Sequence, residues 1–252
     1  MVKVRIIPTL LYKNYGLVKG VKFDSWRRVG SLLQSIKVYS MREVDELIFL
    51  DITATHENRS PDFDLVDDFA DECFMPLTVG GGVKTVENVR HLLKCGADKV
   101  AINSAAFFTP EIINTAARKF GSQCIVASID AKKSSDGEYE VFVNSGTRPT
   151  GLSPFAFAKE MERLGAGEIL LTSIDRDGTM EGYDLDLVKR VTDAVSIPVI
   201  ASGGAGNCDH ILDVLVKGRA SAIALASIFH FTEITPLVIK NMLKQNGIYV
   251  RI

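Results

Sequence analysis

Two aspartates stand where a carboxyl group could take part in chemistry. Asp130 closes the apolar run that begins at Gln123, and its carboxyl group would serve there as a general acid or base. An aspartate that only caps the following turn is the alternative. Asp177 and Gly178 lie in the segment Asp-Arg-Asp-Gly-Thr, after the next apolar run. They are candidates for binding substrate or orienting a loop, although these residue types also simply form turns.

A lysine in a long predicted loop is a further candidate. The loop spans residues 13–30, and Lys19 lies within it. Long loops are often lids, so Lys19 could fold over an anionic substrate. A solvated lysine is the alternative.

Two glycine-rich turns suit phosphate binding, because glycine lets the backbone approach a phosphate closely and free N–H groups act as donors. Each turn is followed one unit later by a small polar strand end, where a hydroxyl and a helix N-terminus would complete the site. The residues concerned are Gly81, Gly82, Asn103, Ser104, Gly203, Gly204 and Ser227. One glycine pair alone is often a tight turn. Two pairs at equivalent places predict two phosphate sites on opposite sides of a barrel mouth, for a long substrate with phosphate at both ends.

Four charged residues stand at the opposite ends of the apolar runs, namely Arg5, Glu46, Lys99 and Glu168. Side chains alternate along a strand, so Glu168 shares a face with Thr172, a further candidate for substrate binding. If these faces point inward, two acids and two bases meet at the floor of a barrel, where buried charges persist only when paired. Such a ring could act as a plug or gate. Ordinary solvent-facing charges are the alternative.

Eight short apolar, β-branched runs predict the elements that position these residues. They begin near Arg5, Glu46, Pro76, Asp98, Gln123, Glu168, Ile197 and Ser221. Each is typical of a buried parallel strand, and helical patterns lie between them. Thr109 and Ser153 each precede a proline, which predicts helix starts. Strand then helix, repeated eight times, predicts an α/β fold of the (β/α)8 barrel type, with chemistry at the carboxyl ends of the strands.

The two halves of the chain repeat each other. Residues 76–82 (PLTVGGG) and 198–204 (PVIASGG) are equivalent third units, and strand spacing in the two halves is similar. No linker of low complexity divides the halves. We therefore expect a duplicated half-barrel that forms one domain over residues 1–252.

Composition excludes several classes of protein. The net charge of -2 gives no strong field toward nucleic acid or anionic lipid, and no apolar stretch approaches the roughly 18 residues that span a bilayer. The apolar run at the N-terminus is too short for a signal peptide, which favours a cytoplasmic protein. Four cysteines without a CxxC pair predict reduced structural thiols. Four histidines without metal-ligand spacing predict structural or surface roles and no metal site.

Seven stretches match a known family, namely residues 49–54 (FLDITA), 77–82 (LTVGGG), 96–100 (GADKV), 120–124 (FGSQC), 165–179 (GAGEILLTSIDRDGT), 200–206 (IASGGAG) and 227–231 (SIFHF). Through them the chain resembles, nearly end to end, the cyclase subunit of imidazole glycerol phosphate synthase. The resemblance implies that a glutaminase subunit docks on the N-terminal face of the barrel. Ammonia released there would pass through the lumen to a substrate at the other face.

The resemblance also implies roles for particular residues. Arg5, Glu46, Lys99 and Glu168 match the family's gate, while Gly82, Asn103, Gly204 and Ser227 lie in its phosphate sites. Asp130 matches one of two essential catalytic aspartates, and Lys19 matches the lysine of a flexible loop. The family's barrel binds no redox cofactor, and no cofactor is expected here.

The second catalytic aspartate of the family is missing. The family ends its first strand with Cys-Leu-Asp-Val-Lys-Asp-Gly, whereas residues 9–15 here read TLLYKNY, so Leu11 occupies the aspartate position. The internal repeat leads to the same conclusion, because it aligns Leu11 with Asp130. Losing one acid–base residue typically lowers the rate about 10²–10⁴-fold. Tyr12 is no evident substitute, since it should point to the opposite face of the strand.

The run from Leu10 to Lys19 is similar to a paralogue group within the family. Those proteins act with a glutaminase and a separate amidotransferase in surface-polysaccharide synthesis, where ammonia converts an acetamido group on a nucleotide-linked sugar to an acetamidino group. Such a role needs the lumen and the gate but not the second acid.

Two other functions stay open. A working cyclase of histidine biosynthesis would explain why both glycine turns persist, although these turns would also suit the diphosphate of a nucleotide sugar. A non-catalytic docking scaffold for a glutaminase is the third hypothesis. A phosphosugar isomerase on a related barrel is disfavoured, because the floor charges and the DRDGT segment have no evident use there.

Overall fold

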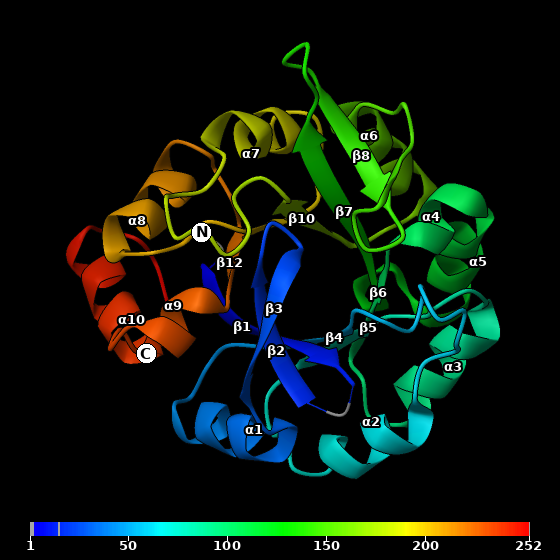
Figure 1. Ribbon diagram of the computed structural model, residues 1–252, viewed down its shortest axis with the longest axis horizontal. Helices are drawn as coiled ribbons and strands as arrows, with labels where there is room; N and C mark the ends of the chain where they lie inside the picture. The colour runs from blue at the N-terminus through cyan, green and yellow to red at the C-terminus, as the bar shows by residue number, and fades with distance from the viewer. Residues whose placement is uncertain (1–2, 15, 252) are drawn as a thin grey trace.

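Eight parallel strands close into a barrel (Figure 1). In ring order after β1 come β4, β5, β6, β7, β10, β11 and β12, and β12 pairs with β1. The barrel strands are β1 (Arg5–Lys13), β4 (Leu47–Asp51), β5 (Leu77–Gly80), β6 (Lys99–Ile102), β7 (Ile125–Lys133), β10 (Glu168–Ser173), β11 (Val199–Ser202) and β12 (Ala222–Leu225). The predicted (β/α)8 barrel is confirmed.

The computed structural model describes residues 3–14 and 16–251. Met1 and Val2, which belong to the N-terminal segment used against a signal peptide, lie outside the described residues, as do Tyr15 and Ile252.

The helices surround the barrel on its outside (Figure 1). They are α1 (Leu32–Met41), α2 (Phe63–Ala70), α3 (Val86–Lys94), α4 (Ser104–Phe108), α5 (Glu111–Phe120), α6 (Pro154–Leu164), α7 (Leu185–Thr192), α8 (Cys208–Val216), α9 (Ser227–Phe231) and α10 (Pro236–Gln245), with the 3₁₀ turn η1 (Ser122–Cys124) before β7. None of them has the length and apolar character that crossing a bilayer requires, as far as the described residues go.

Local sequence explains where many of these helices begin. Asp62, Asp184 and Asn207 each accept a hydrogen bond from a backbone N–H of the following first turn, which satisfies a donor that the helix leaves free. The predicted start at Ser153 is confirmed, with Pro154 as the first residue of α6. At the other predicted start the helix begins one residue late, because Pro110 takes the capping position of α5.

Alternation along the strands divides their side chains between two cores. Outward-facing residues such as Ile6, Leu77 and Val199 join the large cluster packed under the helices. Inward-facing residues form a separate apolar layer within the barrel, made of Ile7, Ile48, Ala101, Val126, Leu170, Ile200, Ala222 and Ala224. Most inward-facing polar residues therefore lie either below this layer, at the floor, or above it, at the mouth, whereas Thr78 lies at the level of the layer, paired with Ile48.

Residues 13–30 are not the loop that the sequence predicts. They contain an antiparallel hairpin of β2 (Gly16–Val21) and β3 (Asp24–Gly30), with β2 also pairing with the end of β1. The hairpin crosses in front of the barrel in Figure 1 and is called the lid below. Exposed, charged residues hide the strand pattern of β3, whose burial alternates irregularly. A second hairpin extends β7 through β8 (Tyr139–Val143), which pairs with β9 (Arg148–Pro149).

The predicted duplication agrees with the local geometry. β5 and β11 each have four residues, and β6 and β12 each lead directly into a five-residue helix. The residues before these helices, Asn103 and Ala226, have similar backbone angles (φ -106°, ψ -92° and φ -132°, ψ -72°). Equivalent strand ends of the two halves thus present their loops in the same way.

Candidate functional site

A pocket of about 1120 Å³, its open mouth included, lies over the carboxyl ends of the strands. Most of the site residues predicted from the sequence line it, namely Leu11, Lys19, Gly81, Asn103, Ser104, Asp130, Thr172, Asp177, Gly178, Gly203, Gly204 and Ser227. Gly82 lies just beside it, and its N–H donates to Oγ1 of the pocket residue Thr55 (3.3 Å). The fold therefore brings the predicted residues together at one end of the barrel.

Asp130 is buried in the wall of this pocket. Its carboxylate accepts a hydrogen bond from Nδ2 of Asn103 (3.0 Å), which also donates to the carbonyl of Ser128. Burial raises the pKa of Asp130 to about 7; the negative charge of Asp177 adds to this rise and the Asn103 hydrogen bond opposes it. A carboxyl group with a pKa near neutrality can both give and take a proton, as a general acid–base residue must.

Leu11 faces Asp130 across the mouth. β1 and β7 are separated by three strands on either side of the ring, so the two residues lie on opposite walls, and both line the pocket. Leu11 pairs in register with Leu50, another lining residue. Tyr12 belongs to the outer face, where its ring packs on Phe49 with centroids 5.6 Å apart. Directly opposite Asp130 the wall is therefore apolar, and the nearest polar group of β1 on this face is the buried hydroxyl of Thr9.

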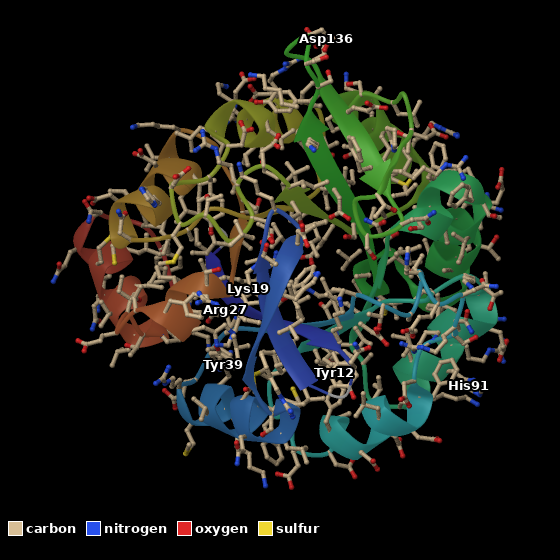
Figure 2. All side chains as sticks on the ribbon, viewed as in Figure 1. Tyr12, Lys19, Arg27, Tyr39, His91 and Asp136 are labelled. Atoms are coloured by element: carbon tan, nitrogen blue, oxygen red, sulfur yellow. The ribbon has the colours of Figure 1, made fainter. Side chains whose placement is uncertain are left out.

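The lid is held shut by a buried ion pair. Nζ of Lys19 lies 2.8 Å from both carboxylate oxygens of Asp177, and the side chains of the pair are 3% and 10% exposed. The N–H of Lys22 donates to the carbonyl of Asp177 (2.8 Å). The guanidinium of Arg27 stacks on the ring of Phe231 at 3.7 Å. Figure 2 shows Lys19 and Arg27 over the middle of the barrel.

The two glycine turns lie on opposite sides of the mouth, because β5 and β11 are themselves separated by three strands on either side. Gly81 and Gly204 have φ values of 109° and 112°. A Cβ atom would lie 2.2 Å from the carbonyl oxygen of Asp51 at the first position and 2.1 Å from that of Gly182 at the second. Both positions thus require glycine to hold the turn against a neighbouring backbone.

Sequence reasoning missed several lining residues, among them Asp51, Trp26 and Phe23. Asp51, at the end of β4, is buried and accepts hydrogen bonds from two backbone N–H groups and from Arg59. Asp51 could have been predicted as a site residue, because it directly follows an apolar run that the sequence analysis identifies as a strand. Trp26 and Phe23 reach the pocket from the lid, and no signal could have found them while the lid was read as a loop.

The four charges at the other end of the barrel form a closed ring. Arg5 lies 2.7 Å from both Glu46 and Glu168, and Lys99 lies 3.0 and 2.9 Å from the same two carboxylates. Burial disfavours the charged form of Arg5, but Glu168 and Glu46 outweigh it and raise the pKa of the guanidinium. Two acids and two bases thus meet at the floor, as predicted, and their formal charges cancel.

Breaking this ring at one position should destabilise the fold. Lys99→Met leaves two carboxylates with one cation, and we expect the free energy of unfolding to fall by about 2 kcal/mol, between the values for exposed and fully buried pairs. Urea denaturation measures the change. Lys37→Met, which removes an exposed pair with Glu72, is the matched control and should cost less than about 1 kcal/mol. Equal effects of the two substitutions would contradict a coupled ring.

The four cysteines and four histidines, all of which the structure describes, do not line the pocket. Burial raises the pKa of all four thiols, which are unpaired: Cys73, Cys95, Cys124 and Cys208. The ring of His91 packs on Phe63 at the periphery, where Figure 2 labels it. His210 accepts a hydrogen bond from the N–H of Gly206 (3.2 Å). His230 lies near the lid, and burial, with Lys19 as a lesser cause, lowers its pKa.

The fold and the pocket define the class of protein, a (β/α)8 barrel with a polar site at the carboxyl ends of its strands. The sequence model of the family described as histidine biosynthesis protein matches residues 5–235. The chain belongs to this family.

Proposed function

We propose that this chain is an ammonia-receiving synthase subunit of a glutamine amidotransferase complex. In this proposal it serves the conversion of an acetamido to an acetamidino group on a nucleotide-linked sugar, in surface-polysaccharide synthesis. One observation carries the proposal. Leu11 stands opposite Asp130 in a pocket that keeps its other polar groups, so the mouth has one acid–base carboxyl group on β7 and none on the facing strand β1.

The barrel interior suits the passage of a small neutral molecule. The layer above the ring of Arg5, Glu46, Lys99 and Glu168 consists mainly of apolar side chains, with the buried hydroxyl of Thr78 beside Ile48 as a polar member. Neutral ammonia can cross such a layer, whereas an ammonium ion would lose its solvation. The ring then acts as the gate at the entrance.

The N-terminal face offers a surface for a glutaminase. Three large apolar side chains are exposed near the amino ends of the strands: Met41 (76%), Phe74 (85%) and Tyr249 (55%). Met41 ends α1, Phe74 precedes β5, and the carbonyl of Tyr249 accepts from the N–H of Val4 beside the start of β1. Exposed apolar groups gathered on one face favour a protein partner.

The substrate of the proposed reaction carries a diphosphate, which the glycine turns would hold. Asp130 supplies or removes the proton at the reacting group, and a separate amidotransferase completes the complex. Ammonia adds to the carbon of the acetamido group and the amide oxygen leaves as water, so no electrons are exchanged and no redox cofactor is needed; the separate amidotransferase is the subunit that would activate this oxygen for departure.

An authentic cyclase of histidine biosynthesis is the second candidate, favoured by family membership and by the persistence of both glycine turns. A docking scaffold without catalysis is a weaker alternative, since it gives no role to a buried carboxyl group with a pKa of about 7.

Genetic complementation separates the two main candidates. A pull-down on the tagged chain should first recover the glutaminase partner. We expect the gene, even when expressed with this glutaminase, to fail to rescue a histidine auxotroph that lacks the cyclase. Leu11→Asp, produced at the same level, is the matched comparison. Rescue by the wild-type gene at a normal growth rate would overturn the proposal.

A further inference from the structure

Two hydroxyl groups of the pocket, those of Thr9 and Ser227, are buried without a hydrogen-bond partner among the residues that the structure describes. Ser227 belongs to the second phosphate site expected from the sequence. Thr9 lies on β1, is 8% exposed, and has no part in the function proposed so far. Buried hydroxyl groups are nearly always hydrogen-bonded, so the hydroxyl of Thr9 requires a partner that enters through the pocket.

Thr9 lies where the interior of the barrel changes from mainly apolar to polar. Along β1 the inward-facing side chains toward the mouth are Ile7, Thr9 and Leu11, and Ile7 belongs to the apolar layer. Thr9 pairs in register with Ile48 of the same layer. Its hydroxyl is therefore the first polar group that β1 offers above the layer, at the level where ammonia would enter the pocket.

The side chains next to Thr9 are apolar. Leu11 lies on the same face of β1 and pairs in register with Leu50, and these three residues, called the Thr9 subsite below, all line the pocket. The family pattern has cysteine and aspartate where this chain has Thr9 and Leu11. This chain has therefore lost a carboxylate and gained a hydroxyl deeper in the pocket, so that one hydrogen-bond donor stands in apolar surroundings.

The Thr9 subsite is unsuited to an ionic group. A charged group placed against Leu11 and Leu50 would lose its hydration, and a hydroxyl could not neutralise it. Asp130 on the facing wall, negative above about pH 7, repels an anion in addition. The subsite therefore favours a neutral group that has an apolar surface and a hydrogen-bond acceptor.

We infer that the Thr9 subsite binds a neutral acetamido group, whose carbonyl oxygen accepts from the hydroxyl of Thr9 and whose methyl group packs on Leu11 and Leu50. That this group belongs to a nucleotide-linked sugar rests on the proposed function. An acetamido group combines one methyl group and one strong acceptor with no charge, which matches the subsite. Bound there, it faces the apolar layer from which ammonia would emerge.

Calorimetric titration of the full chain with two probes tests the inference. Uridine diphosphate N-acetylglucosamine and uridine diphosphate glucose differ only in an acetamido group that replaces a hydroxyl. We expect the first to bind at least about tenfold more tightly, because the second lacks both the methyl group and the carbonyl oxygen. Trp26 is the only tryptophan of the chain and lines the pocket, so its fluorescence should change with the same dissociation constant.

Variants at position 9 separate ligand binding from a structural role. Thr9→Val removes the hydroxyl and keeps the shape, so the preference for the acetamido probe should fall to about threefold or less, whereas Thr9→Ser should retain it. Without a probe, Thr9→Val should melt at the wild-type temperature or above, because no hydrogen bond within the described chain is broken. Ser227→Ala, which removes the other unpartnered hydroxyl of the pocket, is the matched control and should leave the preference unchanged.

Equal affinities of the wild type for the two probes, no binding of either, or an undiminished preference in Thr9→Val would each overturn the inference. Failure of Thr9→Val to fold, or a lower melting temperature, would also overturn it, because the hydroxyl would then serve the fold. Binding that leaves the fluorescence of Trp26 unchanged would place the probe outside this pocket. The proposed function fails by a different result, rescue of the histidine auxotroph, and loss of the preference without such rescue would remove the inference alone.

Discussion

Asparagine in place of Asp130 is expected to stabilise the protein at pH 8 by about 4 kcal/mol while lowering product formation by the complex about 10²–10⁴-fold. Burial raises the pKa of this carboxyl group from 3.8 to about 7. Above pH 7 the folded protein therefore buries a negative charge that is better solvated by water in the unfolded chain, and this lowers the free energy of unfolding. Asparagine has nearly the same shape and can still accept the hydrogen bond from Asn103. Urea denaturation at several pH values, with product assays in parallel, measures both effects.

The sign of the pH dependence is specific to a raised pKa. Between about pH 4 and pH 7 the folded state holds a proton on Asp130 that the unfolded state has lost. The loss in free energy of unfolding caused by the buried charge is therefore absent below pH 4, grows as the pH rises, and is complete above pH 7. The advantage of Asp130→Asn should therefore shrink by about 1.4 kcal/mol for each pH unit below 7. Asp71→Asn, at an exposed position after α2, should show no such trend. A stability difference independent of pH would contradict this description of Asp130.

Methionine in place of Lys19 should open the lid and destabilise the protein by about 3 kcal/mol or more. The substitution leaves the carboxylate of Asp177 buried without its cation, and removing one partner of a buried pair typically costs 3–5 kcal/mol. Amide hydrogen exchange across residues 16–30 should accelerate more than exchange in the barrel strands, since the lid loses its strongest attachment.

Lys22→Met is the matched control for the lid. Lys22 is exposed, and its attachment to Asp177 is through the backbone N–H, which the substitution keeps. This variant should retain the stability and lid protection of the wild type. If Lys19→Met behaved like Lys22→Met, the ion pair would not be what holds the lid.

The barrel could be predicted because its strands carry a local signal. All eight apolar runs became barrel strands within a few residues of their expected starts, since burial on both faces demands continuous apolar sequence. The lid carries no such signal. β3 is mostly exposed, and the contacts that fix the lid, Lys19 with Asp177 and Arg27 with Phe231, join residues far apart in the chain. Pairings of this kind depend on the closed fold and not on local pattern.

The sequence could predict which residues lie at the site but not the contacts that those residues make. Asp130 and the glycine turns follow strand ends, a position that the barrel architecture makes functional. Lys19 was expected over an anionic substrate, and in the structure it is paired with Asp177.

Turnover of the phosphoribosyl-carboxamide substrate of the histidine pathway, measured on the purified chain with ammonium salts, tests the central claim most directly. With leucine at position 11, we expect a rate at least about 100-fold below that of a relative with both aspartates, and a gain on Leu11→Asp. Cyclisation by the wild-type chain at the relative's rate would contradict the role proposed for Leu11 and place the protein in histidine biosynthesis.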